Sequence, residues 1–267
     1  MILNESNYFS PEANQEYMSV SQYKDFCKCE AMAMAKIHGE YEQKFSTALM
    51  VGSYVDAHFE GTLDVFCAKH PEIFLKSGKN AGGLKADYAK ADEIIQRIEA
   101  DPLFMEYMAG EKQTILTAEM FGAKWKIKID SYCKDKIVDL KCMRSLERII
   151  GKSFVEHWGY DYQMAVYSEV ERIAKQRNMS LETYLAVATK EEITNLEIIH
   201  IPDWRRAECL EQIAKDMPRI IAVKSGSVEP ERCGVCDYCK GTKVLTEPID
   251  FELVGLSNIE IKMMRGE

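Results

Sequence analysis

Two runs of alternating polar and apolar residues, 124–132 and 136–141, carry the side chains of this sequence best suited to chemistry. Alternation with a period of two is typical of β-strands that place their polar residues on one face. If Lys134-Asp135 forms a two-residue hairpin loop, residue 130 opposes residue 139. Asp130 and Asp139 then form a directly opposed cross-strand pair, with Cβ atoms roughly 4.5–5.5 Å apart.

Two carboxylates at that separation repel each other unless a cation lies between them. Mg²⁺ or Mn²⁺ suits such hard oxygen ligands, and would polarise a phosphate ester and lower the pKa of a bound water. Lys141 lies on the same face as Asp139, where its ammonium could orient that water or stabilise a more negative transition state. The same register argument adds Glu119 to this face as a further candidate metal ligand.

Hairpin geometry alone leaves a simpler interpretation open, namely an exposed sheet face that carries ordinary solvated charges. Lys126 and Lys128 are expected to be solvated on such a face, although they could also line a groove for nucleic acid. The hairpin therefore predicts a metal site only together with other motifs.

Hydrophobic periodicity predicts the elements that would position these residues. The first 18 residues are expected to be extended, with a loop at 76–84. Helices are expected over 19–36 (with Ser21 as N-cap), 45–68, 87–108, 162–177 and 204–222. A β-meander is expected over 114–121, 124–132 and 136–141, followed by strands at 183–189 and 196–201. No linker divides the chain convincingly, so we expect one domain with a helical part (1–110), a core (111–202) and a C-terminal helix with a Cys-rich tail (203–267).

Composition narrows the class of protein. The chain has 267 residues and a net charge of −9, which argues against coating nucleic acid through overall attraction but allows a local basic groove. No apolar run reaches the roughly 18 residues needed to span a bilayer, and the first residues do not resemble a signal peptide. We expect a soluble cytoplasmic protein with no membrane partner, whose nine cysteines are thiols or metal ligands.

Three motifs in collinear order resemble the PD-(D/E)xK nucleases, and most closely their RecB-like branch, which includes the RecE exonuclease and phage recombination exonucleases. Asp130 followed by Asp139-Leu140-Lys141 is similar to the Asp…(Asp/Glu)-x-Lys motif. Gln163-Met-Ala-Val-Tyr167 is similar to the Gln-x-x-x-Tyr helix that follows the catalytic strands. Gly52-Ser-Tyr-Val-Asp56 occupies the place of an upstream Gly-x-x-x-His motif.

This resemblance implies a restriction-endonuclease-like α/β core, a central mixed sheet flanked by helices, behind a helical N-terminal region. It implies a Mg²⁺-dependent deoxyribonuclease, in particular an exonuclease of recombination or repair, with a phage-type single-strand annealing protein as a partner. Gln163 and Tyr167 share a helix face and are suited to contact DNA or a catalytic carboxylate. Asp56 replaces the family's histidine and is the preferred third metal ligand, with His58 as the alternative.

The replacement of that histidine keeps two other classes open. One is a DNA-binding or assembly module that has lost catalysis on the same fold. The other is a metal-dependent enzyme that hydrolyses a small phosphate ester. Digestion of linear duplex DNA would separate the nuclease from both.

A second set of candidate ligands is Cys233-x-x-Cys236-x-x-Cys239, whose three thiolates need one more donor to complete a four-coordinate site. The segment from Ser21 to Cys29 resembles the N-terminal segment of the AddB nuclease and its CRISPR-adaptation relatives, which hold a [4Fe–4S] cluster with one N-terminal and three C-terminal cysteines. By that resemblance Cys29, or else Cys27, is the fourth ligand. Zn²⁺ bound by four thiolates, and a loop of unliganded cysteines, are the alternatives.

Overall fold

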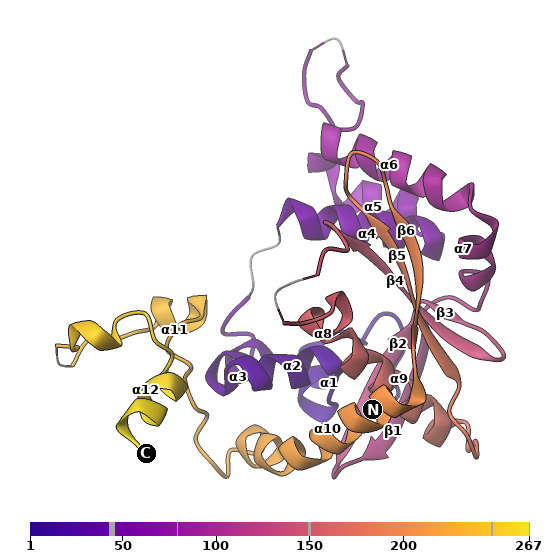
Figure 1. The fold of residues 1–267 in the computed structure, drawn as a ribbon. Helices are drawn as coiled ribbons and strands as arrows, with labels where there is room; N and C mark the ends of the chain where they lie inside the picture. The colour runs from indigo at the N-terminus through magenta and orange to yellow at the C-terminus, as the bar shows by residue number, and fades with distance from the viewer. Residues whose placement is uncertain (43–45, 79, 149–150, 247, 267) are drawn as a thin grey trace. The chain divides into compact units, whose positions relative to one another are not determined.

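The structure is a computed structural model that describes residues 1–42, 46–78, 80–148, 151–246 and 248–266 (Figure 1). The helices up to the first strand are α1 (Pro11–Glu16), α2 (Val20–Lys28), α3 (Glu30–Ile37), α4 (Thr47–Glu60), α5 (Leu63–Lys69), η1 (Pro71–Ile73), α6 (Ala86–Glu99) and α7 (Pro102–Tyr107). The strands are β1 (Thr114–Met120), β2 (Ala123–Ile129), β3 (Ser131–Tyr132), β4 (Lys136–Met143), β5 (Glu182–Thr189) and β6 (Leu196–Ile201). The later helices are α8 (Phe154–Trp158), α9 (Tyr160–Ala174), α10 (Asp203–Lys224), α11 (Asp237–Gly241), η2 (Phe251–Leu253) and α12 (Asn258–Arg265).

A four-stranded mixed sheet has the strand order β3-β4-β5-β6 (Figure 1). The β3–β4 and β5–β6 pairs are antiparallel, whereas β4 and β5 run parallel. Helices α8 and α9 lie between β4 and β5 in the chain and supply the crossover that a parallel pair requires. This is the predicted α/β class, a mixed sheet flanked by helices.

Apolar residues alternate between the two faces of this sheet and bury a helix layer on each side. Val138 and Leu140 of β4 pack with α4 and α6, as do Ala186 and Ala188 of β5. The intervening residues of β5, such as Leu185, pack with α9 instead. Because side chains alternate along a strand, the odd-numbered positions of β4, including 139 and 141, face the α9 side.

The chain divides into two compact units that are interleaved in sequence. One comprises Lys44–Leu116 and Ile127–Leu210 and contains the four-stranded sheet. The other comprises Met1–Gln43, Thr117–Lys126 and Glu211–Glu267. The expected single domain over 1–267 stays a prediction.

Lys126 does not lie on a solvated face, as the strand pattern predicted. Its side chain is 2% exposed, and its ammonium donates to the Tyr8 carbonyl (2.5 Å) and to Asn14 Oδ1 (2.8 Å). The backbone of Met18 pairs with β2 beside it and covers this part of the strand. Burial lowers the pKa of Lys126 to about 8. The N-terminal segment therefore makes this one position of the polar strand face an interior one, whereas Lys124 on the same face is exposed.

Several predicted helices begin or end elsewhere, each for a local reason. The first 18 residues are not wholly extended, because Ser10 caps the short helix α1. The predicted 19–36 helix starts after Ser19, not Ser21, and breaks at Cys29, whose backbone is extended. The 87–108 helix is interrupted where Asp101 caps α7 and Pro102 occupies its first turn.

The 45–68 prediction begins at Phe45, outside the described residues, and the helix there is divided at Gly61, which adopts a left-handed conformation. The expected strands at 183–189 and 196–201 are present. The expected three-stranded meander is split, because β1 and β2 form a separate pair while β3 joins β4. Asp130 is the residue between β2 and β3. Helices α8, α11 and α12 were not predicted.

Candidate active site and cysteine site

Asp130 and Asp139 meet across the β3–β4 hairpin. Tyr132 pairs with Ile137 and Ser131 with Val138, so the register continues to Asp130 opposite Asp139. The Cys133 N–H donates to the Lys136 carbonyl (2.9 Å) and closes the hairpin around the Lys134-Asp135 loop. The structure thus has the hairpin pairing that the sequence predicted.

Asp139 is 2% exposed and contacts two other candidate residues. Gln163 Nε2 donates to Asp139 Oδ1 (2.6 Å), and the Lys141 ammonium forms an ion pair with Asp139 Oδ2. Asp139 Oδ2 nevertheless has no hydrogen bond of good geometry among the described residues. The buried carboxylate is therefore contacted at Oδ1 by an amide and at Oδ2 by an ammonium.

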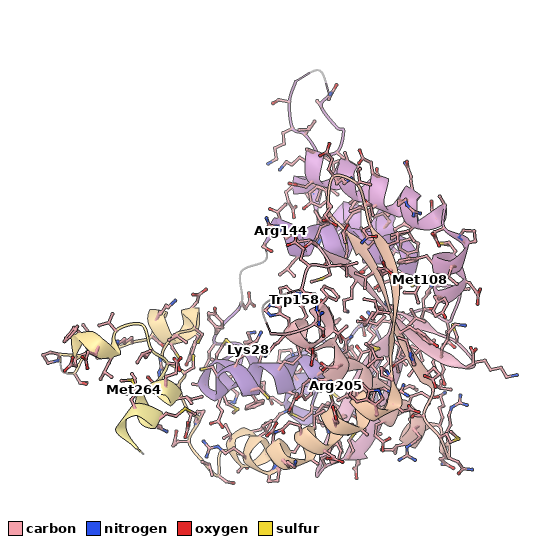
Figure 2. The ribbon with its side chains drawn as sticks, viewed as in Figure 1. Lys28, Met108, Arg144, Trp158, Arg205 and Met264 are labelled. Carbon is pink, nitrogen blue, oxygen red and sulfur yellow. The ribbon has the colours of Figure 1, made fainter. Side chains whose placement is uncertain are left out.

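Helix α9 holds Gln163 in place through an ion pair in its first turn. Asp161 is fully buried, and its Oδ2 accepts from Arg205 Nε (2.9 Å) and Nη2 (2.7 Å). Arg205, labelled in Figure 2, comes from the first turn of α10. Charge-assisted contacts of this kind are strong, so the α9 start is well anchored. Tyr167, one turn after Gln163, is half-buried and packs against the apolar cluster of α9 and β5.

The Asp130 carboxylate is held at both oxygens. Oδ2 accepts from the Leu140 N–H (2.9 Å), and Oδ1 accepts from Gln113 Nε2 (3.2 Å). Burial, and after it the charge of Asp139, raises the pKa of Asp130 to about 7. The two acidic groups are thus close enough to disfavour full ionisation of both.

Asp56 of α4 faces the same place. It lines a cavity together with Glu60, Gln113, Asp130 and the apolar residues Phe59, Met108 (labelled in Figure 2) and Leu140. The cavity is small, with room for about one water or one ion. Burial, and then the charge of Asp130, raises the pKa of Asp56 well above its ordinary value.

His58, the alternative third ligand, is engaged elsewhere: its Nε2 lies 2.8 Å from Glu99 Oε1. Glu119 is exposed on β1, in the other compact unit, and does not line this cavity. Its role as a ligand stays a prediction.

Lys141 is charged in this environment. Burial lowers the pKa of Lys141, but the charges of Asp139 and Asp130 outweigh burial and raise the pKa above its ordinary value. Its Nζ also lies 5.3 Å from the centre of the Tyr160 ring, in cation–π range. The side chain is 20% exposed, so part of this cation can meet a ligand from solvent.

Sequence reasoning missed Gln113, Glu60 and Tyr160. Glu60 follows Asp56 by one helical turn, a spacing that could have identified it. Tyr160 and Gln113 had no comparable signal. The contact of Tyr160 depends on how α9 packs, and that of Gln113 depends on an unusual backbone conformation.

The chemistry of these side chains fits a divalent cation. Mg²⁺ and Mn²⁺ prefer hard oxygen donors. The site offers the opposed carboxylates of Asp130 and Asp139 and a third carboxylate from Asp56. One buried oxygen of Asp139 lacks a hydrogen bond of good geometry among the described residues. Burial raises the pKa values of Asp56 and Asp130, and neighbouring carboxylates raise them further. A bound cation would offset both effects by stabilising the ionised carboxylates.

A separate site is formed by four cysteines of the other unit. The sulfur atoms of Cys29, Cys233, Cys236 and Cys239 all lie within 4.8 Å of one another. Cys29 Sγ lies 3.5 Å from Cys239 Sγ, too far for a disulfide bond. Cys27, the second choice for the fourth position, is exposed and outside this group.

Backbone N–H groups surround these sulfurs and favour their metal-binding thiolate form. The N–H groups of Cys233, Cys236 and Cys239 point to the sulfurs of Cys29, Cys233 and Cys236, at 3.4, 3.3 and 3.4 Å. Such donors stabilise thiolates, and four thiolates at this spacing fit Zn²⁺ or an iron–sulfur cluster. The break between α2 and α3 at Cys29 brings the N-terminal thiol to the loop.

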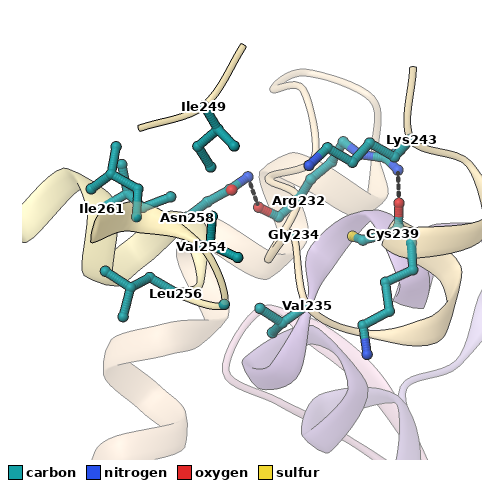
Figure 3. Close-up of a pocket in the computed structure, with 13 residues that line it drawn as sticks. Arg232, Gly234, Val235, Cys239, Lys243, Ile249, Val254, Leu256, Asn258 and Ile261 are labelled. Atoms are coloured by element: carbon teal, nitrogen blue, oxygen red, sulfur yellow. Dashed lines mark hydrogen bonds between the residues drawn. The ribbon is translucent and has the colours of Figure 1, made fainter. Parts of the chain in front are cut away.

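The last helix is fastened to the cysteine loop, as Figure 3 shows. The Asn258 N–H donates to the Cys233 carbonyl (2.9 Å), and Asn258 Nδ2 donates to the Arg232 carbonyl (2.7 Å). Gly234 lies directly under this amide with a φ of +81°. A pocket of about 460 Å³ beside the loop is lined by residues from 232 to 261.

Gly234→Ala is expected to destabilise this contact by about 1–3 kcal/mol, because left-handed backbone disfavours a side chain. The new Cβ would also lie 2.6 Å from Asn258 Oδ1. Gly226→Ala is the matched control, with a φ of +76° and no atom within 4 Å of its Cβ. Limited proteolysis and thermal unfolding should show faster cleavage after residue 243 and a larger loss of stability for Gly234→Ala. Equal behaviour of the two variants would contradict the role of the Asn258 contact.

The mixed sheet and its Asp…Asp-x-Lys hairpin place this protein in the class with the restriction-endonuclease-like fold. The chain belongs to the family described as PDDEXK-like domain of unknown function (DUF3799), whose profile matches residues 19–242. It is also similar to the crystal structure of "Putative exonuclease" from Eubacterium rectale, with 47% identity and a TM-score of 0.89 over 96% of this chain and 99% of that chain. No curated protein matches the chain. Across the described ranges, every helix is too short or too polar to cross a bilayer.

Proposed function

We propose that this protein is a divalent-metal-dependent deoxyribonuclease that acts as an exonuclease, with residues 1–267 forming one nuclease domain. The observation that carries the proposal is the opposed pair Asp130 and Asp139 beside the Lys141 ammonium, on a PDDEXK-like fold. The solved structure at 47% identity, which carries the name "Putative exonuclease", supports the same reaction.

In this proposal Asp130, Asp139 and Asp56 hold Mg²⁺ or Mn²⁺. When bound, the cation would make the scissile phosphate more electrophilic and the attacking water more acidic. Gln163 keeps the Asp139 carboxylate in one orientation through its 2.6 Å hydrogen bond. Tyr167 packs Gln163's helix against the sheet.

Lys141 stabilises the negative charge that gathers on the phosphate oxygens as the water attacks. Its raised pKa keeps the ammonium protonated at neutral pH, so it acts as a fixed cation and not as a base. Tyr160 borders it on one side and Asp139 on the other. These contacts hold the ammonium beside the carboxylates.

DNA is the proposed substrate, in phage-type recombination or repair in the cytoplasm, with a single-strand annealing protein as a partner. The cysteine site is proposed to hold a [4Fe–4S] cluster, with Zn²⁺ as the alternative. Either metal would join residue 29 to the 233–239 loop and would have a structural role, because the cysteines belong to a different compact unit from the carboxylates.

The test is digestion of three DNA substrates by the purified protein with Mg²⁺ or with EDTA: linear duplex, covalently closed circular duplex and linear single strands. We expect release of mononucleotides or short products from linear DNA only with the metal, and an intact closed circle. Cleavage of the closed circle would show an endonuclease instead. DNA binding without cleavage would indicate a module that has lost catalysis. That alternative is considered because Asp56 stands where the family has a histidine. Hydrolysis of mononucleotide analogues but not DNA would indicate an enzyme for small phosphate esters.

A further inference from the structure

Gln113 has a backbone conformation that its residue type does not favour. Its φ is +55°, in the left-handed region, and it directly precedes β1. Glycine and asparagine adopt this region more readily than glutamine does. Residues held in such conformations persist where the surrounding structure requires them, often at functional sites.

The backbone conformation alone does not identify a site. Gln176, after the end of α9, has a φ of +54°, is exposed and does not line the carboxylate cavity. Two further observations distinguish Gln113. Its amide donates to Asp130 Oδ1 (3.2 Å), and its side chain lines the cavity that Asp56, Glu60 and Asp130 share.

The hydrogen bond from Gln113 completes the restraint on the Asp130 carboxylate. The Leu140 N–H, on the neighbouring strand, donates to Oδ2. The amide of Gln113, which lies 17 positions before Asp130 in the chain, donates to Oδ1. Each oxygen keeps a second lone pair for another partner. An amide suits this position because it donates without adding another negative charge beside Asp56 and Glu60.

We propose that Gln113 is a positioning residue that orients Asp130 for binding of the divalent cation. This inference rests on the proposed function. With Gln113 removed, the Leu140 N–H would be the one remaining hydrogen bond to the carboxylate from the part of the chain that the structure describes. Part of the metal-binding free energy would then be spent on orienting the carboxylate. Hydrogen-bond partners of metal ligands typically change metal affinity by about 10–100-fold.

The experiment measures Mn²⁺ affinity of the full-length protein by isothermal titration calorimetry in the absence of DNA. Mn²⁺ is a suitable probe because thiolates bind it poorly, so the cysteine site contributes little. Gln113→Asn keeps an amide and tolerates the left-handed backbone, but its shorter side chain cannot reach Asp130. Gln113→Gly removes the side chain, and Gln176→Gly is the matched control for backbone strain. Circular dichroism and thermal unfolding establish that each variant is folded.

We expect both Gln113 variants to bind Mn²⁺ about 10–100-fold more weakly, and Gln176→Gly to bind like the wild type. Because positioning acts through the cation, saturating Mn²⁺ should restore most of the cleavage rate of Gln113→Asn. Affinities within twofold of wild type for both Gln113 variants, with wild-type binding intact, would overturn this inference alone. If the wild type binds no Mn²⁺, or if Asp139→Asn binds it equally well, the proposed function and this inference both fail.

Discussion

Replacing Lys141 with methionine is expected to reduce DNA cleavage by about 10²–10³-fold, which corresponds to roughly 2.7–4 kcal/mol of transition-state stabilisation. Methionine keeps much of the length and apolar packing of the side chain but removes the ammonium beside Asp139. The loss should fall on kcat rather than on metal binding. Without its ion pair, Asp139 becomes a more available ligand, so Mn²⁺ affinity should be equal to or higher than that of the wild type.

The same strand offers a matched control. Lys136 of β4 lies 3.7 Å from Asp135 and 3.9 Å from Glu106, and it does not line the carboxylate cavity. Lys136→Met should therefore cleave DNA at close to the wild-type rate. Asp139→Asn completes the comparison, because it should lose both cleavage and Mn²⁺ affinity. Single-turnover cleavage and calorimetry of the three variants would refute the assigned role if Lys141→Met retained more than a tenth of the wild-type rate.

Loss of one cysteine of the quartet should release the bound metal and destabilise the protein by several kcal/mol. Cys239→Ser is the sharpest variant, because Cys239 is 2% exposed and its sulfur contacts those of Cys29 and Cys233. Metal binding at a structural site contributes directly to folding free energy. In a chain of this length about 1 kcal/mol corresponds to roughly 2–4 °C, so the melting temperature should fall by about 10 °C.

Cys27→Ser is the control, since Cys27 is exposed and close in sequence to Cys29 but outside the quartet. Metal analysis of anaerobically purified wild type identifies the metal, and an absorbance band at about 400 nm accompanies an iron–sulfur cluster. A chelator should lower the melting temperature of a Zn²⁺ form towards that of Cys239→Ser. Equal metal content and equal melting temperature in Cys239→Ser and wild type would contradict a metal site.

The hairpin was predictable because its geometry is local. Register in a two-residue hairpin follows from the loop, and the alternation of 124–132 and 136–141 fixed which residues share a face. The pairing of Tyr132 with Ile137 therefore agrees with the prediction. The same alternation failed for Lys126, because the strand pattern carries no information about which segment covers a face. The segment that covers Lys126 includes Asn14, which lies 112 positions earlier in the chain.

Helix boundaries were less predictable where tertiary contacts compete with local preference. Pro102 is a local signal for the break between α6 and α7. The prediction of one helix over 87–108 followed the apolar periodicity instead. The break at Cys29 had no such signal, because Cys29 leaves helical geometry where its sulfur meets those of the 233–239 loop.

By itself, the sequence determined the fold class, the opposed carboxylates with their lysine, and the set of cysteines that could bind a metal. The opposed carboxylates depend on residue order and short-range geometry, in which strand alternation leaves few choices. The fold class and the joining of Cys29 to the later cysteines followed from the family resemblance. Only the tertiary structure decided that Gln113 and Leu140 hold Asp130, that Glu60 joins Asp56 at the cavity, and that Cys29, not Cys27, meets the other thiols. Those contacts join segments distant in the chain. Which side chain meets which is therefore decided by the packing of these segments and not by local backbone preference.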